Sequence, residues 1–448
     1  MLNVAILCFV AIIIIAFLKA APEWEDAEQA YYSQWFRLGY NDQPPLYTWI
    51  QILVNKVLGL NRLSLAALRA FWFAGTLMML YKLSYKIHKN INLSALTTFL
   101  VCLIPVFIDF NFRRLTHTSM MCFMCVSLYY WFYRLREDRS LLNYIAFGYI
   151  IGLGLLTKYN FVLLLPVFMI LPFLDEKTKI VYQDIKILLS FLACLLIIAP
   201  HLYWLIDNAA FLSEITHSMR LKTKSNNYGG VPVLTPALAF GKSFINLFLP
   251  LLLLFTFQFF RKKLALKKVI PEWFEQAFWC QFIFALICFV VINSSKVSGR
   301  WLLPLFLPFL VLLTAKLQPV NIRIWNKWSS RLFYIVILFQ IIRTPAEGFL
   351  GINSSVQHSF ERLNEKLNKD FSNKSWVLPD VTYAGSIKLY QQDRIIYAAD
   401  DFTLPKNELD SLQTVYVLKE KKLGFVLKDS IIGFGAEKED LFLCLKLP

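Results

Sequence analysis

Carboxylates and aromatic side chains are concentrated in one stretch near the N-terminus, between Pro22 and Trp49. Four of its five acidic residues lie within six positions of one another: Glu23, Glu25, Asp26 and Glu28. A carboxylate can take the proton of a hydroxyl group that attacks another molecule, and aromatic rings can stack on sugar rings. The same stretch could also be an interfacial helix with no chemistry. The pattern of residues leaves both interpretations open.

Cations and histidines lie near the ends of other apolar segments. Five of these cations and His117 occur in Asp109–Thr118, Leu155–Asn160 and Ser294–Trp301. Such cations could hold a phosphate as it leaves a reacting carbon, or they could simply extend towards the membrane surface. The cations in question are Arg113, Arg114, Lys158, Arg220, Lys222, Lys224, Lys296 and Arg300. The five histidines show no metal-ligand spacing, so no dedicated metal site is expected.

The composition is that of a protein with many membrane spans. Hydrophobic residues make up 57% of the 448 residues and charged residues only 17%, whereas soluble domains have about 45–50% and 25%. The net charge of +16 comes from basic residues between apolar runs. We therefore do not expect a nucleic-acid partner.

Apolar runs of roughly 20 residues predict transmembrane helices. Eleven are expected, at residues 2–20, 63–81, 91–110, 117–133, 141–157, 159–174, 187–205, 235–260, 272–293, 300–316 and 330–348. Alternate loops are rich in Lys and Arg, which places them in the cytoplasm. The N-terminus is then inside, and the loop 21–62 and the C-terminus are outside.

The first outer loop predicts a short amphipathic helix on the membrane surface. Trp24, Tyr31, Tyr32, Trp35 and Phe36 share one helical face. Aromatic side chains on such a helix are expected at the level of the lipid headgroups, with the carboxylates directed to water.

The composition changes after residue 349, so the chain divides into a membrane region, 1–349, and a small soluble α/β domain, 350–448. Ser355–Asp370 has a helical pattern, and Arg394–Ala398, Thr414–Leu418 and Leu441–Leu445 are predicted strands. A nucleotide-binding loop pattern is absent from the sequence, which argues against a pump driven by ATP.

Several of these stretches together resemble the bacterial family 39/83 membrane glycosyltransferases, which have the GT-C fold. This family includes the lipid A aminoarabinose transferases and the protein O-mannosyltransferases. The similar stretches are Glu25–Asp26, Tyr31–Tyr32, Gly39–Tyr40, Pro44–Leu46, Leu115–Thr118, Gly154–Phe161, Pro200–His201 and Gly299–Pro304. The resemblance covers about residues 1–310.

The resemblance implies an inverting transfer of a sugar from a polyprenyl-phosphate donor to an acceptor in the cell envelope. Lipid A, another glycan or a protein could be the acceptor. The implied location is the bacterial inner membrane, with the active site and the C-terminal domain in the periplasm. A divalent metal ion shared by a carboxylate and the donor phosphate would leave no spacing signal in the sequence.

The resemblance also implies residue roles. The family base is the Asp of an Asp-Glu pair; here the order is reversed, so the base is either Glu25 or Asp26. Lys158, Lys296 and Arg300 would meet the donor phosphate, and His117 and Tyr159 would line the site. The substrate-binding residues expected in total are Glu28, Tyr31, Tyr32, Tyr40, Arg113, Arg114, His117, Lys158, Tyr159, His201, Lys296 and Arg300. The family's second acidic position has Asp109 as its nearest match.

Two other functions compete with the enzyme. A transporter or flippase for a lipid-linked saccharide would need charges in mid-span and often has repeated halves; the charges here lie at span ends and no repeat is seen. A non-catalytic membrane scaffold is favoured by the reversed acidic pair. A scaffold would keep its function when both acids are neutralised.

Overall fold

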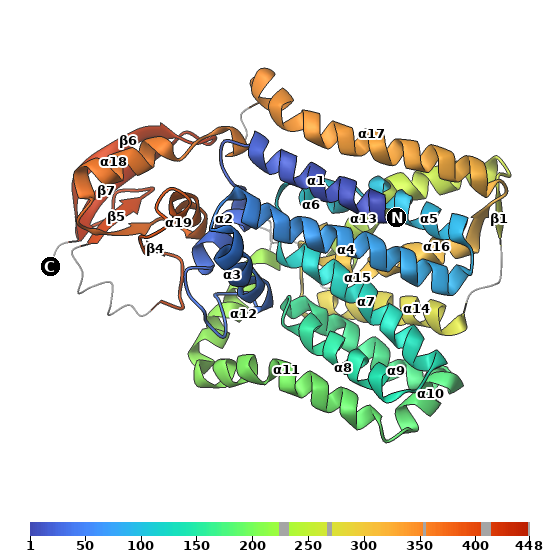
Figure 1. The fold of residues 1–448 in the computed structure, drawn as a ribbon. Helices are drawn as coiled ribbons and strands as arrows, with labels where there is room; N and C mark the ends of the chain where they lie inside the picture. The colour runs from blue at the N-terminus through green and yellow to red at the C-terminus, as the bar shows by residue number, and fades with distance from the viewer. Residues whose placement is uncertain (224–232, 267–270, 353–354, 405–413, 447–448) are drawn as a thin grey trace.

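The computed structural model describes residues 1–223, 233–266, 271–352, 355–404 and 414–446, with residues 217–223 described by backbone only. Figure 1 shows a bundle of helices and, at one end of it, a smaller α/β unit that contains the C-terminal strands. Helices α2 and α3 lie where the two parts meet. The candidate residues of the first loop therefore lie at this junction.

The bundle is built from helices at every segment where the sequence predicts a span. They are α1 (Leu2–Leu18), α4 (Arg62–His88), α5 (Ile91–Phe99), α6 (Pro105–Arg113), α7 (His117–Glu137), α8 (Leu141–Leu155), α9 (Leu165–Leu174), α11 (Ile187–Asp207), α13 (Leu234–Phe260), α14 (Glu272–Val291), α15 (Gly299–Phe306), α16 (Leu310–Lys316) and α17 (Ile322–Phe349). Short 3₁₀ helices lie beside some of these: η1 (Leu100–Leu103), η2 (Tyr159–Leu164) and η3 (Leu307–Phe309).

Four further helices lie in the connections: α2 (Trp24–Tyr32), α3 (Leu46–Leu58), α10 (Glu176–Gln183) and α12 (Ala209–Thr223). The short strands β1 (Leu264–Leu266) and β2 (Leu317–Pro319) pair antiparallel. Helix α7 is central, because it packs against α4, α8 and α15 and most of its side chains are buried. Its first residues, His117 and Thr118, are thereby fixed among the loops at one end of the bundle.

Membrane-spanning length is shown for only part of the bundle. Within the described ranges, six helices are long and apolar enough to cross a membrane, or seven if the bent pair at residues 91–113 counts as one span. Shorter apolar helices lie at Leu2–Leu18, Leu141–Leu155 and Tyr159–Leu174. A total of eleven spans stays a prediction, since several of these helices are shorter than the roughly 20 residues that cross a bilayer.

Local sequence explains where key helices begin and bend. Helix α4 begins at a capping box, in which Asn61 and Ser64 bond each other's backbone amides. The bend of 74° between residues 91–103 and α6 lies at Ile104–Pro105. Proline has no amide hydrogen and disfavours a helical conformation in the residue before it, so the chain turns here and directs α6 towards the first loop.

The C-terminal unit is an α/β fold with one five-stranded sheet. Its strand order is β4-β3-β5-β7-β6, with β3 parallel to β4 and β5, and β7 antiparallel to β5 and β6. Its elements are η4 (Ser355–Gln357), α18 (Glu361–Phe371), β3 (Ser375–Leu378), α19 (Val381–Lys388), β4 (Ile396–Ala398), β5 (Thr414–Leu418), β6 (Phe425–Phe434) and β7 (Glu439–Lys446). The predicted helix and three predicted strands are confirmed, whereas β3, β6 and α19 were not predicted.

The first loop, residues 21–62, differs from its prediction. Helix α2 ends at Tyr32. Tyr31 and Tyr32, expected at the membrane surface, are instead buried in the hydrophobic core of the C-terminal unit and Trp35 packs against it, while Trp24 and Phe36 are exposed. The carboxylates of Glu23 and Asp26, expected in water, are buried. The physical reason is that a second domain covers the apolar face and arginines compensate the acids, and neither partner is local in sequence.

Close packing joins α2 to α19. A Cβ atom placed on Gly385 of α19 would lie 1.7 Å from the carbonyl oxygen of Ala27 in α2. The side chain of Gln34 donates to the carbonyl of Ile396 at 3.1 Å and accepts from the Ile396 amide at 2.9 Å. It thereby bonds the backbone of β4, an outer strand of the sheet. The C-terminal unit thus holds the helix that carries the acidic residues.

We expect Gly385→Ala to destabilise the protein by about 1–3 kcal/mol, since the methyl group meets backbone that must move. The matched control is Gly241→Ala in α13, where nothing lies within 4 Å of the added methyl group. There the better helix propensity of alanine should be neutral or stabilising by up to about 1 kcal/mol. Thermal unfolding followed by tryptophan fluorescence in detergent would compare the two. Equal transition temperatures would contradict the proposed close contact.

Candidate active site

Glu25 lies where three connecting segments meet. One carboxylate oxygen accepts from the Thr116 amide at 2.8 Å and from the Thr116 hydroxyl at 3.2 Å. The other accepts from the guanidinium of Arg300 at 3.2 Å. The side chain of Glu25 is 16% exposed and that of Arg300 is 37% exposed. A carboxylate offers about four acceptor positions, so Glu25 can still accept a hydrogen bond from a hydroxyl group that reaches it.

Asp26 is in a different environment from its neighbour. Its carboxylate forms an ion pair with Arg69 of α4, and the Arg69 side chain is fully buried. Two nitrogens of that guanidinium, Nε and Nη2, have no other partner in the described structure. Asp26 is therefore the counter-charge that Arg69 needs in the interior. Asp26 therefore has a structural role, whereas Glu25 contacts the half-exposed guanidinium of Arg300.

Glu23 joins a buried network of charges with the end of α6. Arg113 donates to Glu23 at 2.8 Å and binds both oxygens of Glu347 at 2.7 and 3.1 Å. Burial favours the protonated acid, but Lys19 and Arg113 more than offset it and hold the pKa of Glu23 below its usual value. The guanidinium of Arg114 lies 3.8 Å from Glu23 and over the ring of Phe110. Both arginines are thus engaged in structural contacts.

His117 links the first loop to the Leu155–Asn160 stretch. Its Nδ1 lies 3.1 Å from the carbonyl oxygen of Thr157, and its Nε2 lies 3.0 Å from the amide nitrogen of Gln29. Donation from Nδ1 and acceptance at Nε2 satisfies both contacts, so we assign the neutral tautomer with hydrogen on Nδ1. Thr48 fixes the orientation of Gln29 by donating to its amide oxygen at 3.0 Å.

Lys158 and Tyr159 follow directly on Thr157. The ammonium of Lys158 donates to the hydroxyl of Thr118 at 2.8 Å, one residue from His117. The hydroxyl of Tyr159 lies 3.3 Å from Nε2 of His201, whose Nδ1 lies 2.7 Å from the Leu38 carbonyl oxygen. These contacts tie α11 to the first loop.

Tyr31, Tyr32 and Tyr40 make their contacts with the C-terminal unit and within the first loop. Tyr31 donates to Asp401 of the C-terminal unit at 2.9 Å, and Tyr40 donates to the Trp35 carbonyl at 2.7 Å. Tyr32 is buried in the same core. Burial, together with the negative charge of Asp401, raises the pKa of Tyr31, so this hydroxyl stays protonated. Glu28 lies on α2 and is half-buried.

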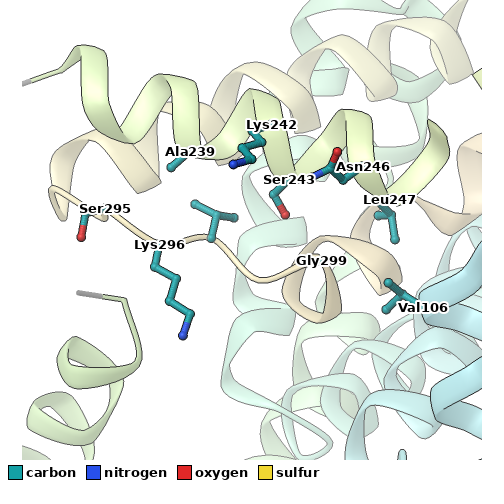
Figure 2. A pocket seen from close by; sticks show the side chains of 10 residues that line it. Val106, Ala239, Lys242, Ser243, Asn246, Leu247, Ser295, Lys296 and Gly299 are labelled. Carbon is teal, nitrogen blue, oxygen red and sulfur yellow. The ribbon is translucent and has the colours of Figure 1, made fainter. Parts of the chain in front are cut away.

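Lys296 lines a cavity of about 390 Å³ beside α13 and the loop that precedes α15 (Figure 2). Across the cavity lies a second lysine, Lys242 of α13. Gly299 also lines this cavity, and the next residue is the Arg300 that contacts Glu25. The cavity therefore adjoins the Glu25 cluster.

The structure thus brings together four stretches that the sequence singled out. Hydrogen bonds connect Glu25 to Thr116 and Arg300, and connect Leu115–Thr118 to Leu155–Asn160. Arg220, Lys222 and Lys224 lie outside the residues whose side chains are described. In the described part of the chain, no three His, Cys, Asp or Glu side chains cluster closely enough to hold a metal ion. A metal shared with the donor phosphate stays a prediction.

Several residues of the site were missed. Gln29 and Glu347 are polar residues with no distinctive spacing, so no signal in one sequence selects them. Thr116 lies in the Leu115–Thr118 stretch that the resemblance covers, but it was not given a role. Arg69 and Lys242 did carry a signal. Each is a lone cation inside a predicted span, and intramembrane charges are expensive enough to be functional or paired.

Comparison with known proteins supports the sequence-based resemblance. The model of the family described as dolichyl-phosphate-mannose-protein mannosyltransferase matches residues 42–204. Two relatives from Rhizobium johnstonii are each 26% identical: the lipopolysaccharide core galacturonosyltransferase RgtB, over 76% of this chain and 69% of that protein, and RgtA, over 87% and 79%. The chain is therefore similar in sequence to glycosyltransferases, as the first loop and the Leu155–Asn160 stretch predict.

The fold agrees with this. The crystal structure of ArnT from Cupriavidus metallidurans bound to undecaprenyl phosphate superposes with a TM-score of 0.65, covering 99% of this chain and 97% of that chain at 12% identity. The apo structure gives 0.61. The predicted resemblance to GT-C glycosyltransferases is confirmed, and so is the mostly helical fold of this class.

The two adjacent acids should respond differently to neutralisation. We expect Asp26→Asn to destabilise the protein by about 3–5 kcal/mol, because it leaves the Arg69 charge buried without a partner. Adding Arg69→Met removes that charge and should recover much of the loss. Glu25→Gln should change stability by less than about 1 kcal/mol, since Arg300 can turn to water. Thermal unfolding of the four proteins in detergent tests this. A stable Asp26→Asn protein would contradict it.

Proposed function

We propose that this protein is an inverting glycosyltransferase. It moves a sugar from a polyprenyl-phosphate donor to an acceptor of the cell envelope, on the periplasmic face of the bacterial inner membrane. The observation that carries the proposal is the position of Glu25, a partly exposed carboxylate at the meeting point of the first loop, the Leu115–Thr118 stretch and Arg300. A base and a cation placed together suit a reaction that takes up a proton and releases an anion.

The chemistry assigns separate roles to this base and to the cations near it. Glu25 accepts the proton of the acceptor hydroxyl as the hydroxyl oxygen bonds to the anomeric carbon of the sugar. The bond between that carbon and the phosphate oxygen breaks, and its electron pair leaves with the polyprenyl phosphate. Attack from the side opposite the leaving phosphate inverts the anomeric carbon. No nucleotide site is required, since the donor arrives already activated.

Arg300 and Lys158 are suited to the leaving phosphate. Arg300 is half-exposed and contacts Glu25, so it can turn a guanidinium face to an anion that enters beside the carboxylate. Lys158 lies on the other side of the Leu115–Thr118 stretch, bonded to Thr118. Cations fixed before the donor binds stabilise charge as it develops on the phosphate. His117 and Tyr159 line the same region through their bonds to Thr157 and His201.

Asp26 is better suited to support than to catalysis. Its ion pair with buried Arg69 fixes α2 against α4, and protonation of Asp26 would remove the counter-charge of a buried guanidinium. If Glu25 is the base, a glutamate stands where the glycosyltransferase family has a catalytic aspartate. The extra methylene requires an acceptor hydroxyl placed correspondingly further from α2.

The acceptor and the sugar are proposed from the relatives. Both relatives from Rhizobium johnstonii are named lipopolysaccharide core galacturonosyltransferases. At 26% identity they support lipopolysaccharide as the acceptor and an acidic hexose as the sugar. ArnT binds undecaprenyl phosphate in its crystal structure, which supports a polyprenyl-phosphate donor. A divalent ion between Glu25 and the donor phosphate is compatible with this arrangement, because each would supply oxygen ligands.

We expect Glu25→Gln to lower sugar transfer by about 100-fold or more, because the amide cannot take the proton of the acceptor. Mass spectrometry of lipopolysaccharide would be compared for cells without the gene and for cells complemented with wild-type or variant protein. The sugar-sized mass that the wild type restores should stay absent with Glu25→Gln.

The matched control is Glu176→Gln, an acid whose side chain is 84% exposed and pairs only with Lys179 three residues later. That protein should restore the wild-type mass. Equal amounts of both variants in the membrane would be checked by immunoblot. Full restoration by Glu25→Gln would exclude Glu25 as the base and favour a scaffold role for the protein.

A further inference from the structure

The cavity beside α13 has features of a binding site that the reaction described above does not use. Its volume of about 390 Å³ lies within the range of roughly 300–1,000 Å³ of small-molecule sites. Lys242 and Lys296 contribute to it from two different elements (Figure 2). Ser243 and Asn246 add a hydroxyl and an amide from the same face of α13. Such polar groups can bond the hydroxyls of a sugar.

The charge of this cavity is uncompensated. None of the residues that line it is acidic. Considering only side chains that the structure describes, neither Lys242 nor Lys296 has an ion-pair partner, whereas Arg69, Arg113 and Arg300 are each paired with a carboxylate. Two unpaired ammonium groups facing one cavity repel each other and attract an anion.

The location of Lys242 strengthens this argument. It lies within α13, one of the helices long and apolar enough to cross a membrane. A charge inside such a helix is expensive, and where it faces a cavity it marks a binding site more often than not. Lys242 and Lys296 are both exposed side chains that line the cavity, and Lys296 lies four residues before Arg300. An anion bound there would lie beside the loop that leads to Arg300.

We propose that Lys242 and Lys296 bind the carboxylate of an acidic sugar on the donor, so that the donor is a polyprenyl-phosphate uronic acid. This inference rests on the proposed function. In a hexuronic acid, C1 carries the phosphate and C5 carries the carboxylate, so the two anions leave different ring carbons. They need two separate sets of cations. Arg300 and Lys158 serve the phosphate beside Glu25, and the lysine pair serves the carboxylate in the adjoining cavity. Lys296, which the family resemblance assigns to the phosphate, takes the carboxylate instead because it lines the same cavity as Lys242.

The lysine pair then determines specificity. A neutral hexose has a hydroxymethyl group where the uronic acid has a carboxylate, and it would leave both ammonium groups without an anion. Hydrogen bonds to charged groups are worth about 1.5–3 kcal/mol, which corresponds to roughly 10-fold or more in affinity. The lysines would thus select acidic sugars and reject the neutral counterpart of the same ring.

The test compares two donors that differ only at this group: undecaprenyl-phosphate galacturonic acid and undecaprenyl-phosphate galactose. Binding of each would be measured to the full chain in lipid nanodiscs, and transfer to lipopolysaccharide would be measured with both. We expect the wild type to bind the acidic donor about 10-fold or more tightly than the neutral one. Lys242→Met and Lys296→Met should each lower this ratio about 10-fold.

The matched control is Lys263→Met. It makes the same change of charge at an exposed lysine just beyond the opposite end of α13, and it should keep the wild-type ratio. Thermal unfolding of each variant would show that the fold is kept. Lys242→Arg retains the positive charge and should keep most of the preference for the acidic donor.

Two results would overturn the proposal. A wild-type protein that binds both donors equally has no site for the carboxylate. A loss of affinity that is equal for both donors in Lys242→Met would mean that the lysines bind the phosphate, which the two lipids share. These results are distinct from failure of the proposed function, since a chain that binds the acidic donor selectively but transfers no sugar would refute the enzyme and keep the binding site.

Discussion

Three carboxylates within four residues of the first loop are neutralised by three arginines from different parts of the chain, and the architecture of the site depends on these pairs. Glu23 pairs with Arg113 of α6, Asp26 with Arg69 of α4, and Glu25 with Arg300 at the start of α15. Each pair is directional and at least partly desolvated, so it fixes where an element lies relative to α2. A buried pair of this kind adds little net stability, because desolvation consumes most of the attraction. Its consequence is a defined geometry around Glu25.

The opposite side of α2 is held by a different kind of contact. The C-terminal unit covers Tyr31 and Tyr32 with its own core and approaches Ala27 so closely that Gly385 leaves no room for a side chain. Burial of apolar side chains stabilises the folded state there, while the arginine pairs fix the orientation of α2 relative to the bundle. Helix α2 therefore packs between the helical bundle and the C-terminal unit. A structural change in either part would shift the position of Glu25. A base on a helix so fixed can keep the demanding alignment that proton transfer needs.

The sequence predicts the parts of this structure that depend on local pattern. Runs of apolar residues located the helices of the bundle, and alternation located β4, β5 and β7. The partners across the fold could not be predicted, since Tyr31 meets Asp401 across 370 positions and Arg113 meets Glu347 across 234. The spacing of aromatic residues on α2 is the same whether they contact a membrane or another domain. We predicted contact with the membrane, but the structure shows contact with the C-terminal unit. Lys242 could have been found, because a lone charge in an apolar helix is itself a signal.

The different positions of arginine and lysine around the site follow from the chemistry of their side chains. A guanidinium presents a rigid, planar set of donors that suits a fixed carboxylate, and Arg113 binds both oxygens of Glu347 in this way. An ammonium group is a compact charge on a flexible stem, which can follow a ligand that enters and leaves. Near Glu25, the guanidinium groups of Arg69, Arg113 and Arg300 are each paired with a carboxylate, while Lys158 donates to a hydroxyl and Lys242 and Lys296 line a cavity. Arg300 stands between these two classes, since it is paired but more than a third exposed. The guanidinium of Arg300 is therefore able to turn from Glu25 towards an anion that enters beside it.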